Sequence, residues 1–314
     1  MNSELVNKIL EGNVLVAARL IRDVEDELPD AVEELESVYL HTGRAYIVGV
    51  AGAPGVGKST LLGTLINIFL MKPMTVGVIA IDPTSPFTGG AILGDRIRMQ
   101  SHGTNKDVFI RSLATRGWKG GLSKATVNTI HVMDAMGKDI IFVEAVGSGQ
   151  GEIDIARVAD TSVILLSPGM GDSIQMMKAG ILEAADIFVI NKADRDGTDN
   201  LKAGLEAMLE MKVYSPGEWR PSIMLTEAIS SRGIEQLTKE IIRHKEFLAS
   251  SGELQERRKE RAELELMMAV EGALKHYIER MDKDYLEKLV DDLVQRRTNP
   301  RSAALTIVNP SEDQ

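Results

Sequence analysis

The chain has 314 residues, 44% of them hydrophobic, so it is long enough to bury the core of one large domain with additions. Its formal net charge of −10 opposes binding to nucleic acid phosphates, and the absence of cysteine excludes disulfides, thiolate metal sites and cysteine nucleophiles. Because no apolar run approaches the roughly 20 residues of a membrane span and the chain begins with no signal-like segment, we expect a cytoplasmic protein that binds neither nucleic acid nor a membrane.

Residues 1–43 are predicted to form an N-terminal helical extension. Apolar side chains recur at helical spacing between Val14 and Ile21. The segment from Asp30 to Glu33 has the spacing of a capping box, so we expect Asp30 to cap the start of another helix.

Strands and helices alternate over residues 44–249, which we assign to one α/β domain. Several predicted strands are nearly continuous Val, Ile and Leu runs, as is typical of parallel strands buried on both faces. They are Tyr46–Ala51, Val76–Ile81, Val108–Arg111, Asp139–Val143, Ser162–Ser167, Asp186–Ile190 and Ser222–Leu225. The predicted fold is therefore a mostly parallel sheet wrapped by helices.

Residues 250–314 are predicted to form a C-terminal helical region. Its first helix is highly charged from Glu253 to Glu265, and apolar residues then recur every three or four positions from Met267 to Met281. Two interpretations are open at this point. The helix packs back on its own domain, or it is an arm that joins two protomers.

A phosphate-binding loop lies between the first predicted strand and a helix over Ser59–Leu70. The sequence GAPGVGKST fits the pattern G-x-x-x-x-G-K-[ST], in which glycines let backbone N–H groups converge on phosphates at a helix N-terminus. We expect Lys58 to reach the β- and γ-phosphates of a nucleoside triphosphate and Ser59 to bind Mg²⁺. The predicted phosphate-binding residues are Gly52, Ala53, Pro54, Gly55, Val56, Gly57, Lys58, Ser59 and Thr60.

A base-recognition motif follows the strand predicted over Asp186–Ile190. Asn191-Lys192-Ala193-Asp194 reads N-K-x-D at the carboxyl end of that strand, where ligands bind in open α/β sheets. The Asp194 carboxylate can accept the N1–H and N2–H₂ donors of guanine, Asn191 can reach N7 and O6, and the Lys192 stem can cover one face of the base. After the last predicted strand, the Ala228 N–H is placed to donate to O6. The predicted nucleotides are therefore GTP and GDP.

Two further strands end in a carboxylate, Asp82 and Glu144. Each carboxylate is expected near the phosphates, although such a residue can also cap the segment that follows it. The stretch from Thr84 to Met99, which contains Asp95, and the stretch from Gly147 to Glu152 are rich in residues that permit conformational change. They are candidate switches that a γ-phosphate and Mg²⁺ would order.

Together these residues resemble the MeaB/ArgK-type GTPases associated with methylmalonyl-CoA mutase, which are P-loop GTPases of the SIMIBI type. The resemblance covers nearly the whole chain. It rests on the phosphate loop, on DPTSPFTGGAILGDRIRM from Asp82 to Met99, on EAVGSGQGE from Glu144 to Glu152, on the long segment from Ser167 to Asp194, and on TNPRSAA near the C-terminus.

The resemblance implies a homodimer joined by C-terminal helices. It also implies a chaperone that binds an adenosylcobalamin-dependent acyl-CoA mutase and uses GTP to gate cofactor loading and removal. Lys58, Ser59, Asp82, Asp95 and Glu144 would be the catalytic and metal-binding set, and a third switch would run from Pro168 to Lys178.

The second switch departs from the family pattern E-T-V-G-V-G-Q-S-E, because Ala145, Ser148 and Gly151 replace Thr, Val and Ser. Three alternatives to a mutase chaperone are open. A metal-inserting GTPase usually carries Cys and His clusters, whereas this chain has no cysteine and five isolated histidines, which favours surface or helix-face positions for them. A kinase of a transport protein needs an acceptor site and a base, and neither is identified. A protein that binds the nucleotide without hydrolysing it would give Asp82, Asp95 and Glu144 no catalytic role.

Overall fold

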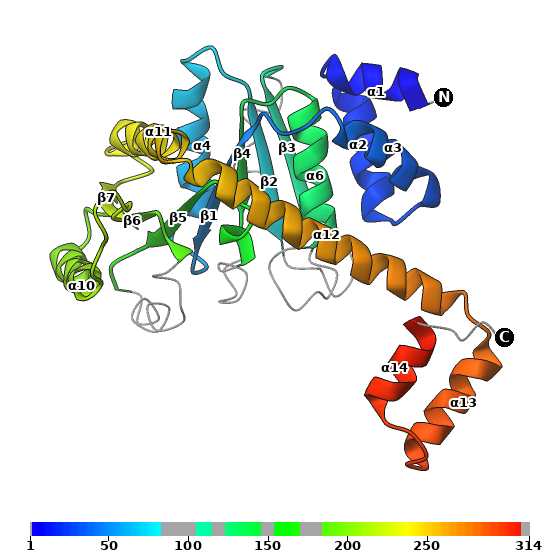
Figure 1. Ribbon diagram of the computed structural model, residues 1–314. Coiled ribbons are helices and arrows are strands. Elements are labelled where there is room, and N and C mark those ends of the chain that lie inside the picture. Colours follow the sequence, from blue (N-terminus) through cyan, green and yellow to red (C-terminus); the bar gives the residue numbers. More distant parts are fainter. Residues whose placement is uncertain (1, 83–104, 115–122, 146–153, 170–183, 309–314) are drawn as a thin grey trace. The chain divides into compact units, whose positions relative to one another are not determined.

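The computed structural model describes residues 2–82, 105–114, 123–145, 154–169 and 184–308 (Figure 1). The chain divides into two compact units, Met1–Arg261 and Ala262–Gln314. The division into residues 1–43, 44–249 and 250–314 stays a prediction. Among the described residues, no helix is long and apolar enough to cross a membrane.

A seven-stranded parallel sheet forms the centre of the first unit, as predicted. In the described part of the chain its strand order is β3-β2-β4-β1-β5-β6-β7, and every neighbouring pair is parallel. The strands are β1 (Tyr46–Gly52), β2 (Val76–Asp82), β3 (Val108–Ala114), β4 (Ile140–Glu144), β5 (Thr161–Leu166), β6 (Ile187–Asn191) and β7 (Ser222–Thr226). All seven predicted strands are found, with ends that differ by a few residues. Buried β-branched runs therefore identified the sheet correctly.

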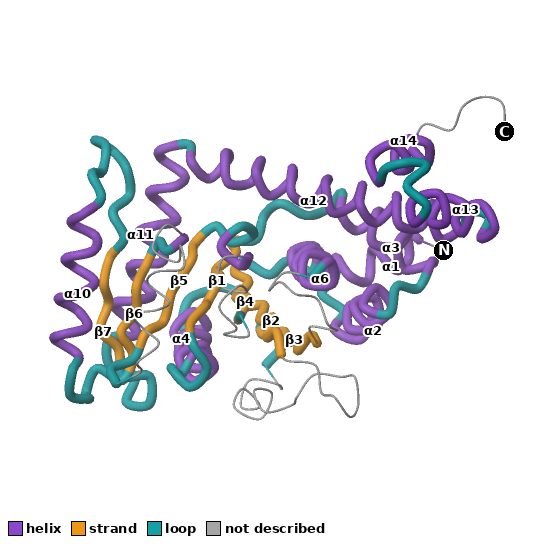
Figure 2. The backbone as a smooth tube through the Cα atoms, turned by 90° about the horizontal axis from the view of Figure 1, so that it is seen from below, coloured by secondary structure: helices purple, strands orange, loops and turns teal. Residues whose placement is uncertain are grey.

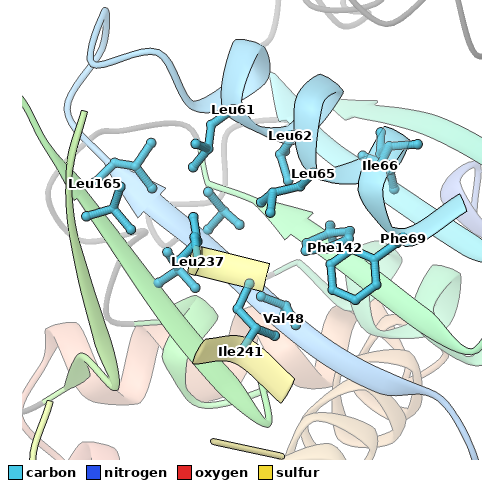
Figure 3. Close-up of a cluster of buried hydrophobic side chains, with 14 of the residues drawn as sticks. Val48, Leu61, Leu62, Leu65, Ile66, Phe69, Phe142, Leu165, Leu237 and Ile241 are labelled. Atoms are coloured by element: carbon cyan, nitrogen blue, oxygen red, sulfur yellow. The ribbon is translucent and has the colours of Figure 1, made fainter. Parts of the chain in front are cut away.

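Helices lie on both faces of this sheet (Figures 1 and 2). Helices α4 (Lys58–Leu70) and α11 (Ile234–Ser251) pack on one face, where their apolar residues meet those of β1, β4 and β5 in one buried cluster (Figure 3). Helix α6 (Lys124–Ala135) covers the other face, because the side of β2 that carries Gly77 meets Met133 of α6. Helix α10 (Thr198–Met211) follows β6.

The N-terminal extension consists of three helices that pack beside α6. They are α1 (Asn2–Leu10), α2 (Val14–Glu25) and α3 (Pro29–Tyr39), and both α2 and α3 contact α6. The expected capping role of Asp30 is wrong. Helix α3 begins at Pro29 after Leu28, so Asp30 lies in the first turn, where its carboxylate faces the positive end of the helix dipole.

Arginines anchor the start of α12 (Glu253–Glu279) to the amino ends of β5 and β6. The Arg257 guanidinium donates to both carboxylate oxygens of Asp186, at 2.7 and 2.8 Å, and Arg261 donates to Asp160 Oδ1 at 3.1 Å. Asp160 is fully buried and Asp186 nearly so. Because a buried carboxylate without a partner is costly, these pairs fix the first turns of α12 on the domain that precedes it.

The second unit contains the rest of α12 together with α13 (Lys283–Val294) and α14 (Pro300–Val308). Its α12 segment carries a stripe of exposed apolar side chains at helical spacing: Leu266, Met267, Val270, Leu274 and Tyr277. The helix predicted from Glu253 onward is thus present, and it continues through the apolar repeat.

A buried histidine lies next to the anchored start of α12. His244 of α11 is fully buried, its Nδ1 lies 2.7 Å from the Thr161 hydroxyl, and its ring centroid lies 4.5 Å from that of Trp219. Burial lowers the pKa of His244 from 6.5 to about 4, although the Asp186 carboxylate opposes this effect. The charged groups that face the ring are Asp186, Glu240, Arg243 and Arg257. The folded protein therefore holds His244 in its neutral form.

This depressed pKa makes stability depend on pH. Between pH 6.5 and 4 the unfolded chain protonates His244 and the folded protein does not, so the stabilising contribution of the neutral ring is complete above pH 6.5 and is lost as pH falls. We expect a loss of roughly 3 kcal/mol, since the pKa of His244 falls from 6.5 to about 4 on folding and one pKa unit is worth 1.36 kcal/mol. Urea unfolding of the wild type and of His244→Gln at several pH values should give a stability difference that narrows toward pH 4. A difference that stays constant would contradict this account.

Candidate functional site

The predicted site residues gather at the carboxyl ends of the parallel strands. The phosphate loop follows β1, Glu144 ends β4, the N-K-x-D segment begins at the last residue of β6, and Ala228 follows β7. Since β4, β1, β5, β6 and β7 are successive neighbours, all these segments open on the same edge of the sheet. This is the position at which open α/β sheets bind ligands.

Two glycines of the phosphate loop leave no space for a side chain. Gly52 has φ 147°, and a Cβ there would lie 2.4 Å from the Leu165 carbonyl oxygen. Gly57 has φ 102°, and a Cβ there would lie 2.5 Å from Asn191 Nδ2. Both contacts are shorter than a real Cβ tolerates. The loop can therefore approach β5 and the base-recognition segment only because these two residues lack side chains.

Lys58 begins α4 and folds back over the loop. Its side chain is largely buried, and Nζ donates to the carbonyl oxygens of Gly52 at 2.8 Å and Ala53 at 3.3 Å. The ammonium group is therefore held at the loop, beside the N-terminus of α4, where the helix dipole also favours an anion.

Ser59 and Glu144 are brought together from α4 and β4. The Ser59 hydroxyl donates to Glu144 Oε1 at 3.0 Å, and both side chains are buried. Hydroxyl and carboxylate oxygens are the donors that Mg²⁺ prefers, so this pair fits the predicted metal.

The rest of the predicted metal set lies outside the described side chains. Asp82 is the last residue of β2, and the register that pairs Ala80 with Glu144 places its backbone at the same edge of the sheet. Asp95 and both proposed switch segments, Thr84–Met99 and Gly147–Glu152, are outside the described residues, as are positions 170–178 of the third switch. Within the described ranges, no group of three acidic or histidine residues could hold a metal ion. The magnesium site therefore stays a prediction.

Asn191 connects three segments of the site. Its Nδ2 donates to the Val56 carbonyl oxygen at 2.8 Å, and its Oδ1 accepts from the Thr226 hydroxyl and from the Ala228 N–H, both at 3.1 Å. The sequence predicted that Asn191 and Ala228 contact guanine, whereas here they contact each other. Their contacts with a base stay a prediction, and the structure adds that this side chain joins the phosphate loop to the end of β7.

Lys192 and Asp194 line a pocket to which Asn191 also contributes. Lys192 has φ 60°, which is uncommon for a residue with a side chain, and its Nζ donates to the Gly55 carbonyl oxygen at 2.6 Å. This contact stretches the lysine stem across to the phosphate loop. The pocket has a volume of 230 Å³. Its lining residues are Gly57, Thr60, Asn191, Lys192, Asp194, Glu227, Ala228, Ile229 and Ser230.

The loop after β7 contributes more to this pocket than the sequence indicated. Ala228 was predicted from its position, but Ile229 and Ser230 were not. The only sequence signal for them is that they continue the same turn toward Gly233. A site residue in such a turn is recognised only when its contacts are seen.

Comparison with known proteins finds the same family along most of the chain. Residues 17–282 match the family described as methylmalonyl-CoA mutase-associated GTPase MeaB. The chain is 48% identical to a protein of Pyrococcus abyssi that is named as a GTPase, over 97% of this chain and 95% of that protein. It is 34% identical to GTPase ArgK of Escherichia coli, over 83% of this chain and 81% of that protein. The crystal structure of a LAO/AO transport system kinase aligns with a TM-score of 0.70 and 26% identity, over 98% and 96% of the two chains.

Proposed function

The chain belongs to the family of methylmalonyl-CoA mutase-associated GTPases, MeaB, and from this premise we propose that it is a GTP-hydrolysing chaperone of an adenosylcobalamin-dependent acyl-CoA mutase. The proposed partner is methylmalonyl-CoA mutase or a close relative. GTP binding and hydrolysis would gate the loading, protection and reactivation of the mutase cofactor.

One observation carries the nucleotide part of this proposal: the base-recognition segment is bonded directly to the phosphate loop. Asn191 donates to Val56 and Lys192 donates to Gly55, so the pocket that contains Asp194 opens beside the glycines that would hold phosphates. A nucleotide needs these two subsites side by side. The Asp194 carboxylate matches the paired donors of guanine, which adenine lacks.

The chain's own residues supply most of the chemistry of phosphoryl transfer, which depends on positioning and on charge stabilisation. Lys58 would bind the β- and γ-phosphates from its place over the loop. Ser59 and Glu144, with Asp82 and Asp95, would hold Mg²⁺, which when bound neutralises phosphate charge. Glu144 would also orient the attacking water.

Homodimerisation is the second part of the proposal, and the exposed stripe on α12 supports it. An isolated helix gains little by leaving large apolar side chains such as Leu266, Met267 and Val270 in water. A second copy of the C-terminal region would cover them. The third switch, from Pro168 to Lys178, is the proposed route by which nucleotide state reaches the mutase.

Two other functions are less well supported. A metal-inserting GTPase is disfavoured by the absence of cysteine. The protein in the aligned crystal structure is named as a transport system kinase. A kinase requires a general base beside an acceptor site, and the residues that line the described pocket, such as Asp194 and Gly57, instead suit a nucleobase and a phosphate.

A hydrolysis assay with two nucleotides and one partner tests the proposal. We expect slow phosphate release from GTP, little from ATP, and an increase of about tenfold on addition of methylmalonyl-CoA mutase, equivalent to about 1.4 kcal/mol off the barrier. Serum albumin in place of the mutase is the control. Equal phosphate release from ATP and GTP would contradict the guanine assignment. A rate of GTP hydrolysis that does not change when the mutase is added would contradict only the proposed partner.

A further inference from the structure

Ser167 is a buried polar residue at the carboxyl end of the sheet. It follows β5 directly and is only 1% exposed. Among the described residues, none forms a hydrogen bond with its hydroxyl oxygen. A buried hydroxyl without a partner destabilises a protein, so native structures contain few of them. Alanine would occupy this position without that cost, and the presence of serine therefore needs an explanation.

The place of Ser167 in the sheet directs its side chain toward the phosphate loop. Leu165 of β5 belongs to the buried cluster between the sheet and helices α4 and α11 (Figure 3). Side chains alternate along a strand, so Ser167 is the next residue on that face, and Pro168 after it favours an extended backbone. The pairing of β1 with β5 sets Gly52 beside Leu165, and two residues further along the two chains are Pro54 and Ser167. The hydroxyl is therefore placed beside the phosphate loop.

Several carbonyl oxygens of the phosphate loop accept a hydrogen bond from a side chain. The donors are the ammonium groups of Lys58 and Lys192 and the amide group of Asn191. The carbonyls that they contact belong to Gly52, Ala53, Gly55 and Val56. Within the described part of the chain, by contrast, no donor reaches the Pro54 carbonyl oxygen. An acceptor of the loop and the Ser167 donor thus both lack a partner there.

We propose that Ser167 is a positioning residue of the phosphate loop, whose hydroxyl donates to the Pro54 carbonyl oxygen when a nucleotide is bound. Pro54 and Gly55 share one planar peptide unit, so the carbonyl of Pro54 points away from the N–H of Gly55. A phosphate draws the N–H groups of the loop toward itself, and Gly55, with φ 81°, has the backbone freedom to follow. The Pro54 carbonyl then turns toward the strands. This inference rests on the proposed guanine nucleotide function.

The test compares two enclosed serine hydroxyls. Ser167→Ala should weaken GDP binding by about fivefold, the effect of losing one neutral hydrogen bond. Ser112→Ala is the matched control, because the Ser112 hydroxyl is also buried and makes no hydrogen bond to the described residues, while β2 and β4 separate its strand, β3, from β1. It should leave the GDP affinity within about twofold. Isothermal titration with GDP and with pyrophosphate, together with urea unfolding of the nucleotide-free proteins, provides the readouts.

Urea unfolding separates a hydrogen bond formed on binding from one that the free protein already makes. Without nucleotide, Ser167→Ala should be at least as stable as wild type, because the substitution removes a hydroxyl and breaks no hydrogen bond. Pyrophosphate, which lacks ribose and base, should lose affinity by the same factor as GDP, because Ser167 acts on the phosphate loop. Unchanged GDP affinity in Ser167→Ala would overturn the inference, and so would a clear loss of stability in the nucleotide-free variant. A wild-type protein that bound no GDP would overturn the proposed nucleotide function and this inference together.

Discussion

Lys58→Ala is expected to lower the affinity for GTP by about 100-fold or more. The ammonium group is held at the phosphate loop by the carbonyl oxygens of Gly52 and Ala53, so it is in place before a phosphate arrives. Hydrogen bonds to charged groups are worth about 1.5–3 kcal/mol each, and loss of contacts to two phosphates amounts to about 3 kcal/mol or more. Titration of each protein with GTP and Mg²⁺ measures the change.

Glu144→Ala is the informative comparison, because it alters the same site without removing the positive charge. It should keep much of the nucleotide affinity and hydrolyse GTP poorly, since Glu144 is assigned to the shell of the metal and the water. Wild-type affinity in Lys58→Ala would mean that this loop does not bind the phosphates. Normal turnover in Glu144→Ala would remove that residue from the catalytic set.

The sheet was predictable from the sequence because its strands are buried on both faces. A run such as Tyr46–Ala51 or Asp186–Ile190 has no polar alternation, which is typical of a strand buried on both faces inside a layered α/β fold. The loop glycines and the N-K-x-D segment were predictable for a related reason. Their chemistry is local, and their place after a strand fixes which edge of the sheet they occupy.

The hydrogen bonds by which Asn191 connects the phosphate loop to the end of β7 were not predictable in the same way. Asn191 bonds to Val56, far earlier in the chain, and to Ala228, well after it. A side chain that can contact either a base or the backbone offers no local signal to decide between them. The sequence therefore singled out Asn191 as a candidate site residue but did not indicate that its side chain joins these segments.

The sequence also did not predict which single polar residues are buried. Isolated histidines are usually found on surfaces or helix faces, whereas His244 is fully buried against Thr161 and Trp219. The start of α3 was misjudged because Pro29 at the first helical position outweighed the capping pattern at Asp30. Tertiary packing determines the burial of His244, and the restricted backbone of Pro29 determines where α3 begins. The spacing of residues in the sequence shows neither effect.

Asp194 has the chemistry that distinguishes guanine from other purines. Its side chain is exposed and lines the pocket. Asn191 and Lys192, which line the same pocket, are hydrogen-bonded to the phosphate loop. An acceptor carboxylate is satisfied by N1–H and N2–H₂ of guanine together. Sites built on such hydrogen bonds reject an analogue strongly, because the analogue leaves their polar groups unpaired.

Asp194→Asn should therefore weaken GTP binding by about 100-fold and raise the affinity for xanthosine triphosphate, whose oxygen at C2 accepts the hydrogen bond that the asparagine amide donates. Competition among GTP, ATP and xanthosine triphosphate measures both changes. Asp196→Asn is the matched control, because Asp196 is an exposed carboxylate two residues away that does not line the pocket, and it should keep the wild-type order. An Asp194→Asn protein that still preferred GTP would show that base selection lies elsewhere in the pocket.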